Sequence, residues 1–227
     1  MQIMGHRGAA GLAPENTIAS IAEGLAAKAD WIEFDVRRTR DGHIVLVHDA
    51  HTGRVAKKRL VISKSAMAEL QEIEMKRGHA IPTLEEAIEL IGKKAKINIE
   101  IKSPDCVPQV VELVQKYIKK GYAKSHFLVS SFSPAVLRAV QELDKTVPLG
   151  LLQIWPVRFR WLSSVKLSAV GFYHISALTP FIVALAKRKG LYTYAYTVNS
   201  TEEAKQLKRL GIDGIVTNYP NKFDELR

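Results

Sequence analysis

Residues 31–36 read Trp-Ile-Glu-Phe-Asp-Val, a short apolar run of the kind that forms a buried β-strand, yet the run contains two acids. Side chains alternate between the faces of a strand, so Glu33 and Asp35 lie on the same face, roughly 6.5 to 7 Å apart along it. Two carboxylates held that close repel each other unless a cation or a proton lies between them. The run therefore predicts a strand that carries a charged site.

A second run, at residues 96–102, has a similar character. It reads Lys-Ile-Asn-Ile-Glu-Ile-Lys and places Glu100 and Lys102 at the end of an apolar strand. Carboxylate oxygens are the ligands that hard divalent ions prefer. Glu100, with Glu33 and Asp35, is therefore a candidate ligand set for Ca²⁺ or Mg²⁺.

Apolar runs of strand length recur along the whole chain, with helical patterns between them. They lie near residues 2–4, 31–36, 96–101, 127–130, 149–152, 170–172, 192–196 and 214–216. Most begin about 20 to 30 residues apart, the usual size of one strand-helix unit. Eight strands alternating with helices predict a parallel sheet, and the number eight favours a (β/α)8 TIM barrel over an open doubly wound sheet.

Capping residues mark the boundaries of the expected helices. Residues 83–86 and 200–203 read as capping boxes, and Ser-Pro and Thr-Pro pairs at 133–134 and 179–180 open two further helices. Glycines at positions 92, 190 and 211 follow the expected helix ends.

One interval, from Trp31 to Lys96, is too long for a single strand-helix unit and has room for about 35 extra residues. It contains a strand-like run at 44–47 and a basic, glycine-containing stretch at 52–60. We expect an insertion at about residues 40–80, a small subdomain over the rim where barrel enzymes keep their chemistry. Since no Gly/Ser-rich or Pro-rich linker divides the sequence, residues 1–227 are predicted to form a single domain.

Composition sets limits on the class of protein. The chain has 227 residues, 47% of them hydrophobic and 25% charged, and Cys106 is its one cysteine, which excludes an internal disulfide. The formal net charge is +10, and the whole excess of basic residues falls in residues 114–227. A positive field of this kind would attract anionic substrates, nucleic acid or an acidic membrane surface equally well. The first residues form no secretion signal, and Gly171 and Pro180 interrupt the uncharged stretch 167–186, so we expect a cytoplasmic protein without a membrane span.

The strand order gathers several chemically active side chains at one end of the barrel. In a parallel barrel the carboxyl ends of all strands meet on one face. That face would hold the three acids with His6, Arg7, His48 and Lys102. Each residue also has a structural alternative, because single histidines are often only hydrogen-bonded, and because Lys102 can simply pair with Glu100.

For the two acids of the first run the structural alternative is an ion pair. Arg37 and Arg38 follow them closely, and either would need to reach the inward face to pair with Glu33 or Asp35. Independent coincidences at three successive strand ends are much less probable than any one of them, which favours a functional site.

Several short motifs give the chain a resemblance to the glycerophosphodiester phosphodiesterase family. In order they are His6-Arg7-Gly8, Ala13-Pro14-Glu15-Asn16-Thr17, Glu33-Phe34-Asp35-Val36, Val47-His48-Asp49, Pro82-Thr83-Leu84-Glu85, Glu100-Ile101-Lys102, Ser131-Phe132, Tyr196-Thr197-Val198-Asn199, Gly211-Ile212-Asp213-Gly214 and Thr217-Asn218-Tyr219-Pro220. Each string alone is weak evidence, but their order and spacing from Gly5 to Pro220 are highly specific.

The resemblance implies a TIM barrel with a defined set of site residues. Glu33, Asp35 and Glu100 would bind Ca²⁺ or Mg²⁺, and His6 and His48 would be the acid-base pair. Arg7 and Lys102 would contact the phosphate. Tyr196 would form the aromatic wall of the alcohol pocket, at a position where the family usually has Trp. Glu15 and Asn16 would fix a loop and cap a helix. Residues 50–54, Ala-His-Thr-Gly-Arg, depart from the family's usual Arg-Thr-Thr string.

The expected activity is hydrolysis of a glycerophosphodiester to glycerol 3-phosphate and an alcohol, with one imidazole neutral and the other protonated. An alternative is a lysophospholipase D that contacts a membrane weakly through the aromatic and basic residues 155–161. A third interpretation is nucleic-acid binding by Lys116, Lys119, Lys120 and Lys124, but no nucleic-acid motif accompanies them, so we expect none. The sequence leaves the alcohol and the oligomeric state open.

Overall fold

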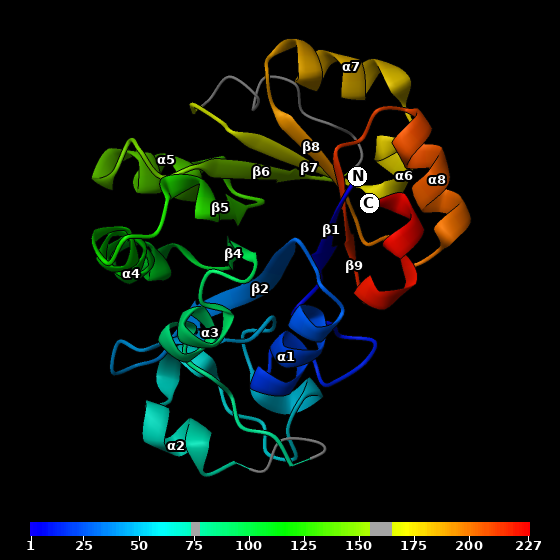
Figure 1. The fold of residues 1–227 in the computed structure, drawn as a ribbon. Coiled ribbons are helices and arrows are strands. Elements are labelled where there is room, and N and C mark those ends of the chain that lie inside the picture. Colours follow the sequence, from blue (N-terminus) through cyan, green and yellow to red (C-terminus); the bar gives the residue numbers. More distant parts are fainter. Residues whose placement is uncertain (74–77, 155–164) are drawn as a thin grey trace.

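Eight parallel strands form a closed barrel in the computed structural model, which describes residues 1–73, 78–154 and 165–227. The barrel closes because β1 pairs with both β2 and β9. Its strands are β1 (Gln2–Gly5), β2 (Trp31–Arg38), β4 (Lys96–Ile101), β5 (Phe127–Ser131), β6 (Leu149–Gln153), β7 (Ala169–Tyr173), β8 (Tyr192–Tyr196) and β9 (Gly214–Thr217). Helices surround them (Figure 1), and the predicted (β/α)8 TIM barrel is confirmed.

The helices around the barrel begin and end close to the predicted signals. They are α1 (Ile18–Ala26), α3 (Leu84–Ile91), α4 (Val107–Lys119), α5 (Pro134–Leu143), α6 (His174–Ala177), α7 (Pro180–Arg188) and α8 (Thr201–Arg209). Thr83 forms the predicted capping box with Glu86. The box predicted at Ser200 is only half formed: the Ser200 hydroxyl accepts from the backbone of Glu203, whose carboxylate contacts His174 instead of returning to the cap.

Alternation along each strand separates two apolar layers. Ile32, Phe34 and Val36 of β2 point outward into the core beneath the helices. The barrel interior is filled by Met4, Trp31, Leu128, Leu152, Ala169, Tyr194 and Val216. Along the inward face of β2, Trp31 is followed by Glu33 and Asp35, so the interior changes from apolar to charged toward the carboxyl ends of the strands.

The long interval after β2 forms a small subdomain beside the barrel, as the sequence predicted. Its strand β3 (Ile44–Leu46) pairs antiparallel with β2 and is followed by two single turns of 3-10 helix, η1 (Thr52–Arg54) and η2 (Ile62–Lys64), and by α2 (Met67–Gln71). The segment has an apolar cluster of its own, formed by Val45, Val47, Ala56, Ile62, Met67, Leu70, Ile73 and Ile81. This cluster holds η1, and with it Arg54, near the carboxyl ends of the barrel strands.

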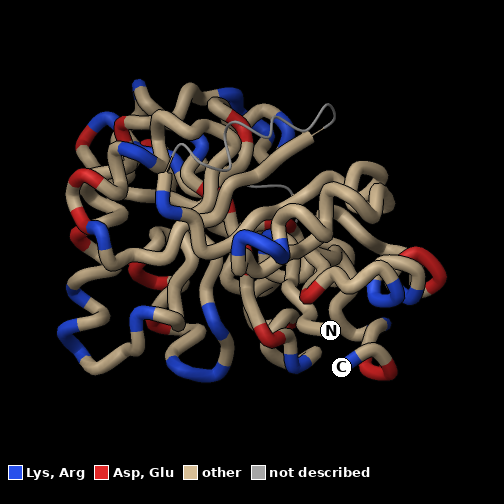
Figure 2. Tube along the Cα trace, turned by 90° about the horizontal axis from the view of Figure 1, so that it is seen from above, with Lys and Arg blue, Asp and Glu red and all other residues tan. Residues whose placement is uncertain are grey.

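Charged residues are interspersed around the chain in Figure 2 rather than gathered on one side. Within the proposed nucleic-acid stripe, Lys116 pairs with Glu85 at 2.5 Å and Lys120 lies over the ring of Tyr117. In the parts of the chain that the structure describes, every helix is too short or too polar to cross a bilayer. The aromatic and basic run at 155–161 lies outside the described residues.

Gly8 shows how tightly the first loop packs on α1. Its φ is +87°, and a Cβ there would lie 2.4 Å from the backbone of Ser20. Only glycine meets both the left-handed conformation and this close approach without strain.

We therefore predict that Gly8→Ala destabilises the fold by about 2 to 5 kcal/mol, through left-handed strain plus overpacking. Gly190→Ala is the matched control, because Gly190 has φ +71° but nothing within 4 Å of the new Cβ; it should cost only about 1 to 2 kcal/mol. Urea denaturation measures both, and equal losses would contradict the packing argument.

Candidate active site

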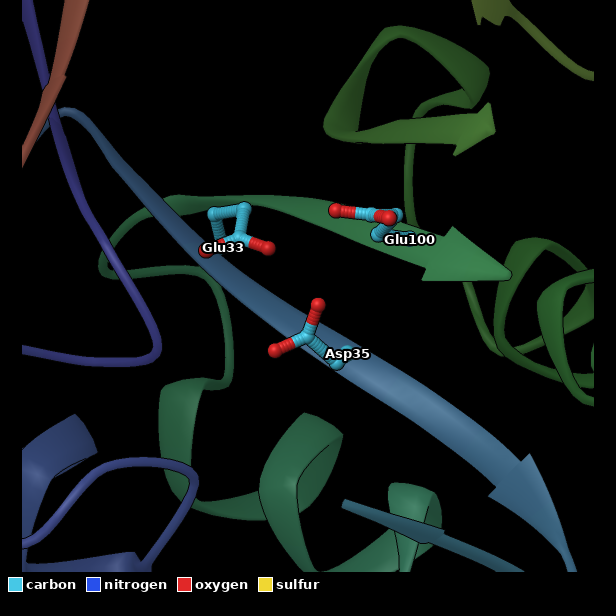
Figure 3. A group of neighbouring side chains, drawn as sticks. All are labelled: Glu33, Asp35 and Glu100. Carbon is cyan, nitrogen blue, oxygen red and sulfur yellow. The ribbon is translucent and has the colours of Figure 1, made fainter. Parts of the chain in front are cut away.

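Three buried carboxylates face a common space at the carboxyl ends of β2 and β4 (Figure 3). Glu33, Asp35 and Glu100 each present an oxygen, and these oxygens all lie within 4.8 Å of one another. The parallel register of β2 and β4 puts Asp35 beside Glu100, so the three side chains share the inward face. Their residues are 4%, 1% and 8% exposed, which is rare for acids unless they are paired or bind a metal.

The three acids differ in charge state because their surroundings differ. Burial, with the neighbouring Asp35 and Glu100, raises the pKa of Glu33 well above its usual range. Burial and Asp35 likewise raise the pKa of Glu100 to about 7. Burial alone would raise the pKa of Asp35 too, but Lys102 and Arg7 outweigh it and hold that pKa below its usual range. Without further positive charge, Asp35 is therefore readily ionised, whereas Glu33 and Glu100 resist ionisation.

Two cations contact Asp35. The Arg7 guanidinium lies 3.1 Å from one oxygen, and the Lys102 ammonium lies 3.1 Å from the other. The structural alternative of an ion pair with Arg37 or Arg38 is therefore wrong for Asp35. Arg37 turns away, because its Nε donates to the carbonyl of the residue at position 48.

Lys102 also pairs with Glu100 at 2.6 Å, the contact expected from the sequence. Its ammonium thus bridges two of the three carboxylates. Burial would lower the pKa of Lys102, but Asp35 and Glu100 outweigh it and raise the pKa, so the side chain stays charged.

His6 lies at the end of β1 and lines the same cavity as Glu33 and Glu100. Its Nδ1 is 2.6 Å from the amide oxygen of Asn218, an acceptor, so Nδ1 carries the proton and Nε2 has a free lone pair. Burial and the adjacent Arg7 lower the pKa of His6 to about 4. His6 is therefore a neutral imidazole at neutral pH.

His48 follows β3 and has a carboxylate partner instead. Its Nδ1 is 2.7 Å from Asp49, which in turn accepts from Arg54 Nε at 2.7 Å. Burial lowers the pKa of His48, while Asp35 and Asp49 act in the opposite direction. Such a carboxylate fixes the tautomer of the ring and stabilises its protonated form.

Arg54 connects the inserted subdomain to the first loop. Besides Asp49, its guanidinium binds both carboxylate oxygens of Glu15, at 2.6 and 2.7 Å. Glu15 in turn accepts from Arg7 at 2.8 Å. A continuous series of ion pairs and hydrogen bonds thus joins His48 to the three acids through Arg54, Glu15, Arg7 and Lys102. His6 stands outside this series but lines the same cavity as Glu33 and Glu100.

The first loop also contacts the acids directly. Asn16 has φ +55°, and its side-chain amide donates to Asp35 at 3.0 Å while accepting from the Asp35 backbone. Arg7, at φ +50°, donates its backbone N–H to Glu33 at 2.8 Å. The loop-fixing role expected for Glu15 and Asn16 is present, but the helix cap itself is Thr17.

Aromatic rings line one side of the site. Tyr196, at the end of β8, has its ring 5.8 Å from that of Phe132 in an edge-to-face arrangement, and its hydroxyl donates to the carbonyl of Gln153. Lys102 lies 5.8 Å from the centre of the Phe132 ring. A cleft of about 330 Å³ opens beside these groups, bordered by Glu100, Lys102 and Phe132.

Sequence reasoning gave no role to Arg54, to the Asp49 carboxylate or to Asn218, although the last two stand within quoted motifs. Asp49 directly follows a candidate catalytic histidine, which is a usable signal for an orienting carboxylate. Nothing in the spacing of Arg54 indicates that it reaches Glu15, 39 positions away in the chain.

Comparison with known proteins agrees with this geometry. Residues 6–222 match the model of the glycerophosphoryl diester phosphodiesterase family. The chain belongs to this family. Membership makes it an enzyme of the phosphodiesterase class.

Relatives match over almost their full lengths. A glycerophosphodiester phosphodiesterase from Caldanaerobacter subterraneus subsp. tengcongensis is 31% identical, over 99% of this chain and 96% of that protein. A phosphodiesterase from Oleispira antarctica, solved in complex with the product sn-glycerol-3-phosphate, is 27% identical with a TM-score of 0.90 over 99% and 96% of the two chains. The glycerophosphodiester phosphodiesterase from Thermotoga maritima is 26% identical with a TM-score of 0.85, over 99% and 97%.

The crowding of the acids predicts an unusual pH dependence of stability in the metal-free protein. Folding raises the pKa of Glu100 from 4.5 to about 7, so between these pH values the folded state retains a proton that the unfolded state has lost, and this stabilisation disappears as pH rises through 7. With Glu33, whose pKa is also raised, the free energy of unfolding should therefore fall as pH rises from about 7 to 8.5. The histidines act in the opposite direction, because folding lowers their pKa values, but their effect is largely complete above about pH 7, where the unfolded imidazoles have lost most of their protons.

Melting temperatures measured in EDTA across this window test the expectation. Glu100→Gln should flatten the slope, since it removes one of the two titrating acids. A wild-type melting temperature that rises or stays level between these pH values would contradict the described charge states.

Proposed function

We propose that this enzyme hydrolyses glycerophosphodiesters to glycerol 3-phosphate and an alcohol, using one divalent cation, Ca²⁺ or Mg²⁺, and the histidine pair His6 and His48. The observation that carries the proposal is the convergence of three buried carboxylate oxygens within 4.8 Å of one another beside these imidazoles. The product complex of the Oleispira relative supports the choice of product.

The ligand set fits a hard divalent cation. Its donors are all oxygens, as Ca²⁺ and Mg²⁺ prefer, and two of its acids have pKa values that are raised for lack of positive charge. With the acids ionised, three carboxylates and the two cations Arg7 and Lys102 leave one negative charge. Binding a dication would reverse that sign and match a monoanionic phosphodiester.

Glu33, Asp35 and Glu100 would hold the cation, which when bound supplies Lewis-acid neutralisation of a phosphoryl oxygen. Arg7 and Lys102 would share in binding the phosphate, because both carry their charge at this face and have oxygen-directed N–H groups. Both side chains are in ion-pair contact with Asp35, which keeps their positive charges at this face.

The two imidazoles have different surroundings, which suggests different roles. His6 is neutral with a free Nε2, so it would accept the proton of the attacking hydroxyl, which belongs to water or to the glycerol of the substrate. Attack by the glycerol hydroxyl would give a cyclic phosphate, which water then opens to glycerol 3-phosphate. Burial lowers the pKa of His48 as well, but the Asp35 and Asp49 carboxylates act against that shift, so His48 is protonated more readily than His6 and would donate a proton to the oxygen of the leaving alcohol. As the new P–O bond forms and the old one breaks, one proton passes from the hydroxyl to His6 and another from His48 to the alcohol.

The phosphate would bind beside the cavity lined by His6, Glu33 and Glu100, and the rest of the substrate would extend into the cleft bordered by Glu100, Lys102 and Phe132. The volume of this cleft, about 330 Å³, is at the small end of ligand pockets. Phe132 and Tyr196 would cover the carbon atoms of the substrate, with Tyr196 in place of the usual Trp. The cytoplasmic location expected from the sequence stays a prediction.

A lysophospholipase D activity at the same site is a second candidate. Large apolar side chains are exposed near the carboxyl ends of the strands, with Phe132 at 39%, Ile154 at 58% and Ile175 at 60%. Such a border suits a weak contact with a membrane or a single acyl chain. Turnover of a lysophospholipid at a rate comparable to glycerophosphocholine would favour this reading.

We predict that His6→Ala and His48→Ala each lower kcat/KM for glycerophosphocholine by about 100- to 10,000-fold, the usual contribution of a general acid or base. EDTA should abolish turnover, and added Ca²⁺ or Mg²⁺ should restore it. His43→Ala, at a histidine whose side chain is 54% exposed on the inserted subdomain, is the control and should retain wild-type turnover. Release of glycerol 3-phosphate is the measured quantity, and full activity in EDTA would remove the metal from the proposal.

The assignment of base and acid has its own test. A glycerophosphodiester with a p-nitrophenol leaving group needs little protonation of the departing oxygen, so it should restore most of the loss in His48→Ala but little in His6→Ala. Restoration of His6→Ala instead would exchange the two roles.

A further inference from the structure

Tyr194 lies at the boundary between the apolar filling of the barrel and the acids above it. The residue is 1% exposed and belongs to the apolar cluster of the barrel interior. Its ring crosses the interior where β7 has Gly171; a Cβ on that glycine would lie 2.5 Å from the ring. The tyrosine therefore has a dedicated space, and its orientation is fixed.

The hydroxyl of Tyr194 is fully buried and makes no hydrogen bond of good geometry among the described residues, although the side chains of Asn98 and Ser130 lie close to it. It borders a cavity of about 30 Å³ that is also lined by Glu33 and Glu100. The polar neighbours in the cavity are already engaged, since Ser130 donates to Asn98 at 2.8 Å and the Asn98 amide nitrogen is directed at the sulfur of Met4. A buried phenol left without a partner is costly, which calls for an explanation.

The acids bordering the cavity have spare acceptor capacity. Among the described residues, Glu33 accepts the backbone N–H of Arg7 on one oxygen, and Glu100 accepts Lys102 on one oxygen. The remaining oxygens can each take a donor when the acids are ionised. Metal-binding carboxylates are commonly held by such hydrogen bonds from a neighbouring layer.

We propose that Tyr194 is a positioning residue for the metal site: its hydroxyl donates a hydrogen bond to one ionised carboxylate, that of Glu33 or of Glu100, when the acids bind the divalent cation. The hydroxyl is unpartnered in the metal-free protein and becomes satisfied in the loaded one. This inference rests on the proposed metal site and adds a residue to it.

Two effects of opposite kind should follow from Tyr194→Phe, which removes only the hydroxyl. Calorimetric titration with Ca²⁺ and with Mg²⁺ should show metal affinity lowered about 10- to 100-fold, the usual loss for a missing outer hydrogen bond. The metal-free variant should melt at the same temperature as wild type or higher, because an unsatisfied buried group has been removed.

Tyr192→Phe is the matched control. Tyr192 is two positions earlier on β8, and its hydroxyl is likewise buried without a partner among the described residues, but it lies at the other end of the strand, close to Gly214. This variant should also melt no lower than wild type in EDTA, yet bind metal as wild type does. A tyrosine difference absorption on adding metal to wild type should survive in Tyr192→Phe and disappear in Tyr194→Phe.

The outcomes separate the two proposals. Absence of metal binding by wild type would reject the proposed metal site itself. If wild type binds metal, less than a tenfold loss of affinity in Tyr194→Phe, or an equal loss in the Tyr192→Phe control, would overturn the role of Tyr194. A metal-free Tyr194→Phe protein that melts below wild type would do so as well, because the hydroxyl would then be satisfied in the metal-free state.

Discussion

Repulsion among three buried carboxylates is the constraint around which this protein is arranged. Glu33, Asp35 and Glu100 lie on two adjacent strands, and a register shift of one residue would turn Glu33 and Asp35 to the opposite face of the sheet. Such a group is costly to bury, and packing against apolar residues cannot offset the cost. Asp35 remains ionised because Arg7 and Lys102 contact it, while the other two acids keep raised pKa values. A site in this condition has a strong electrostatic preference for added positive charge.

The elements around the acids hold this arrangement in place. The first loop brings Arg7 and Asn16 onto the acids in left-handed conformations, which persist only where surrounding contacts determine them. Arg54 of the inserted subdomain holds Glu15 and Asp49 together and so links the loop to His48. The subdomain, which lies beside the barrel, therefore fixes the orientation of one of the two imidazoles.

The fold and the composition of the site could be predicted from sequence because both depend on local patterns. Strand periodicity placed Glu33 and Asp35 on one face, and the parallel topology placed Glu100 and His6 at the same end of the barrel. His48 reaches that end for a different reason, because the strand before it, β3, runs antiparallel to β2. The hydrogen-bond partners could not be predicted in this way. Whether Asp35 contacts Arg7 or Arg37 depends on how the loop folds over the strand, and that follows from long-range packing rather than from spacing.

The same limit applies to Tyr194 and Arg54. A tyrosine in an apolar strand is expected to be a core residue, and the space beside Gly171 on the neighbouring strand, which Tyr194 fills, cannot be predicted from the sequence of β8. Arg54 lies in a basic stretch with several similar residues. That Arg54, rather than one of its neighbours, contacts Glu15 depends on the apolar cluster that positions η1. The half-formed box at Ser200 has a comparable cause, because His174, a residue of another helix, contacts Glu203.

Anomalous diffraction from crystals of the enzyme grown with Mn²⁺, an oxygen-preferring substitute for Ca²⁺ or Mg²⁺, tests the central claim most directly. The account predicts a single strong anomalous peak bounded by the carboxylates of Glu33, Asp35 and Glu100. A site in which Lys102 still bridges Asp35 and Glu100 with no peak between the three acids, at saturating Mn²⁺ and neutral or higher pH, would contradict it.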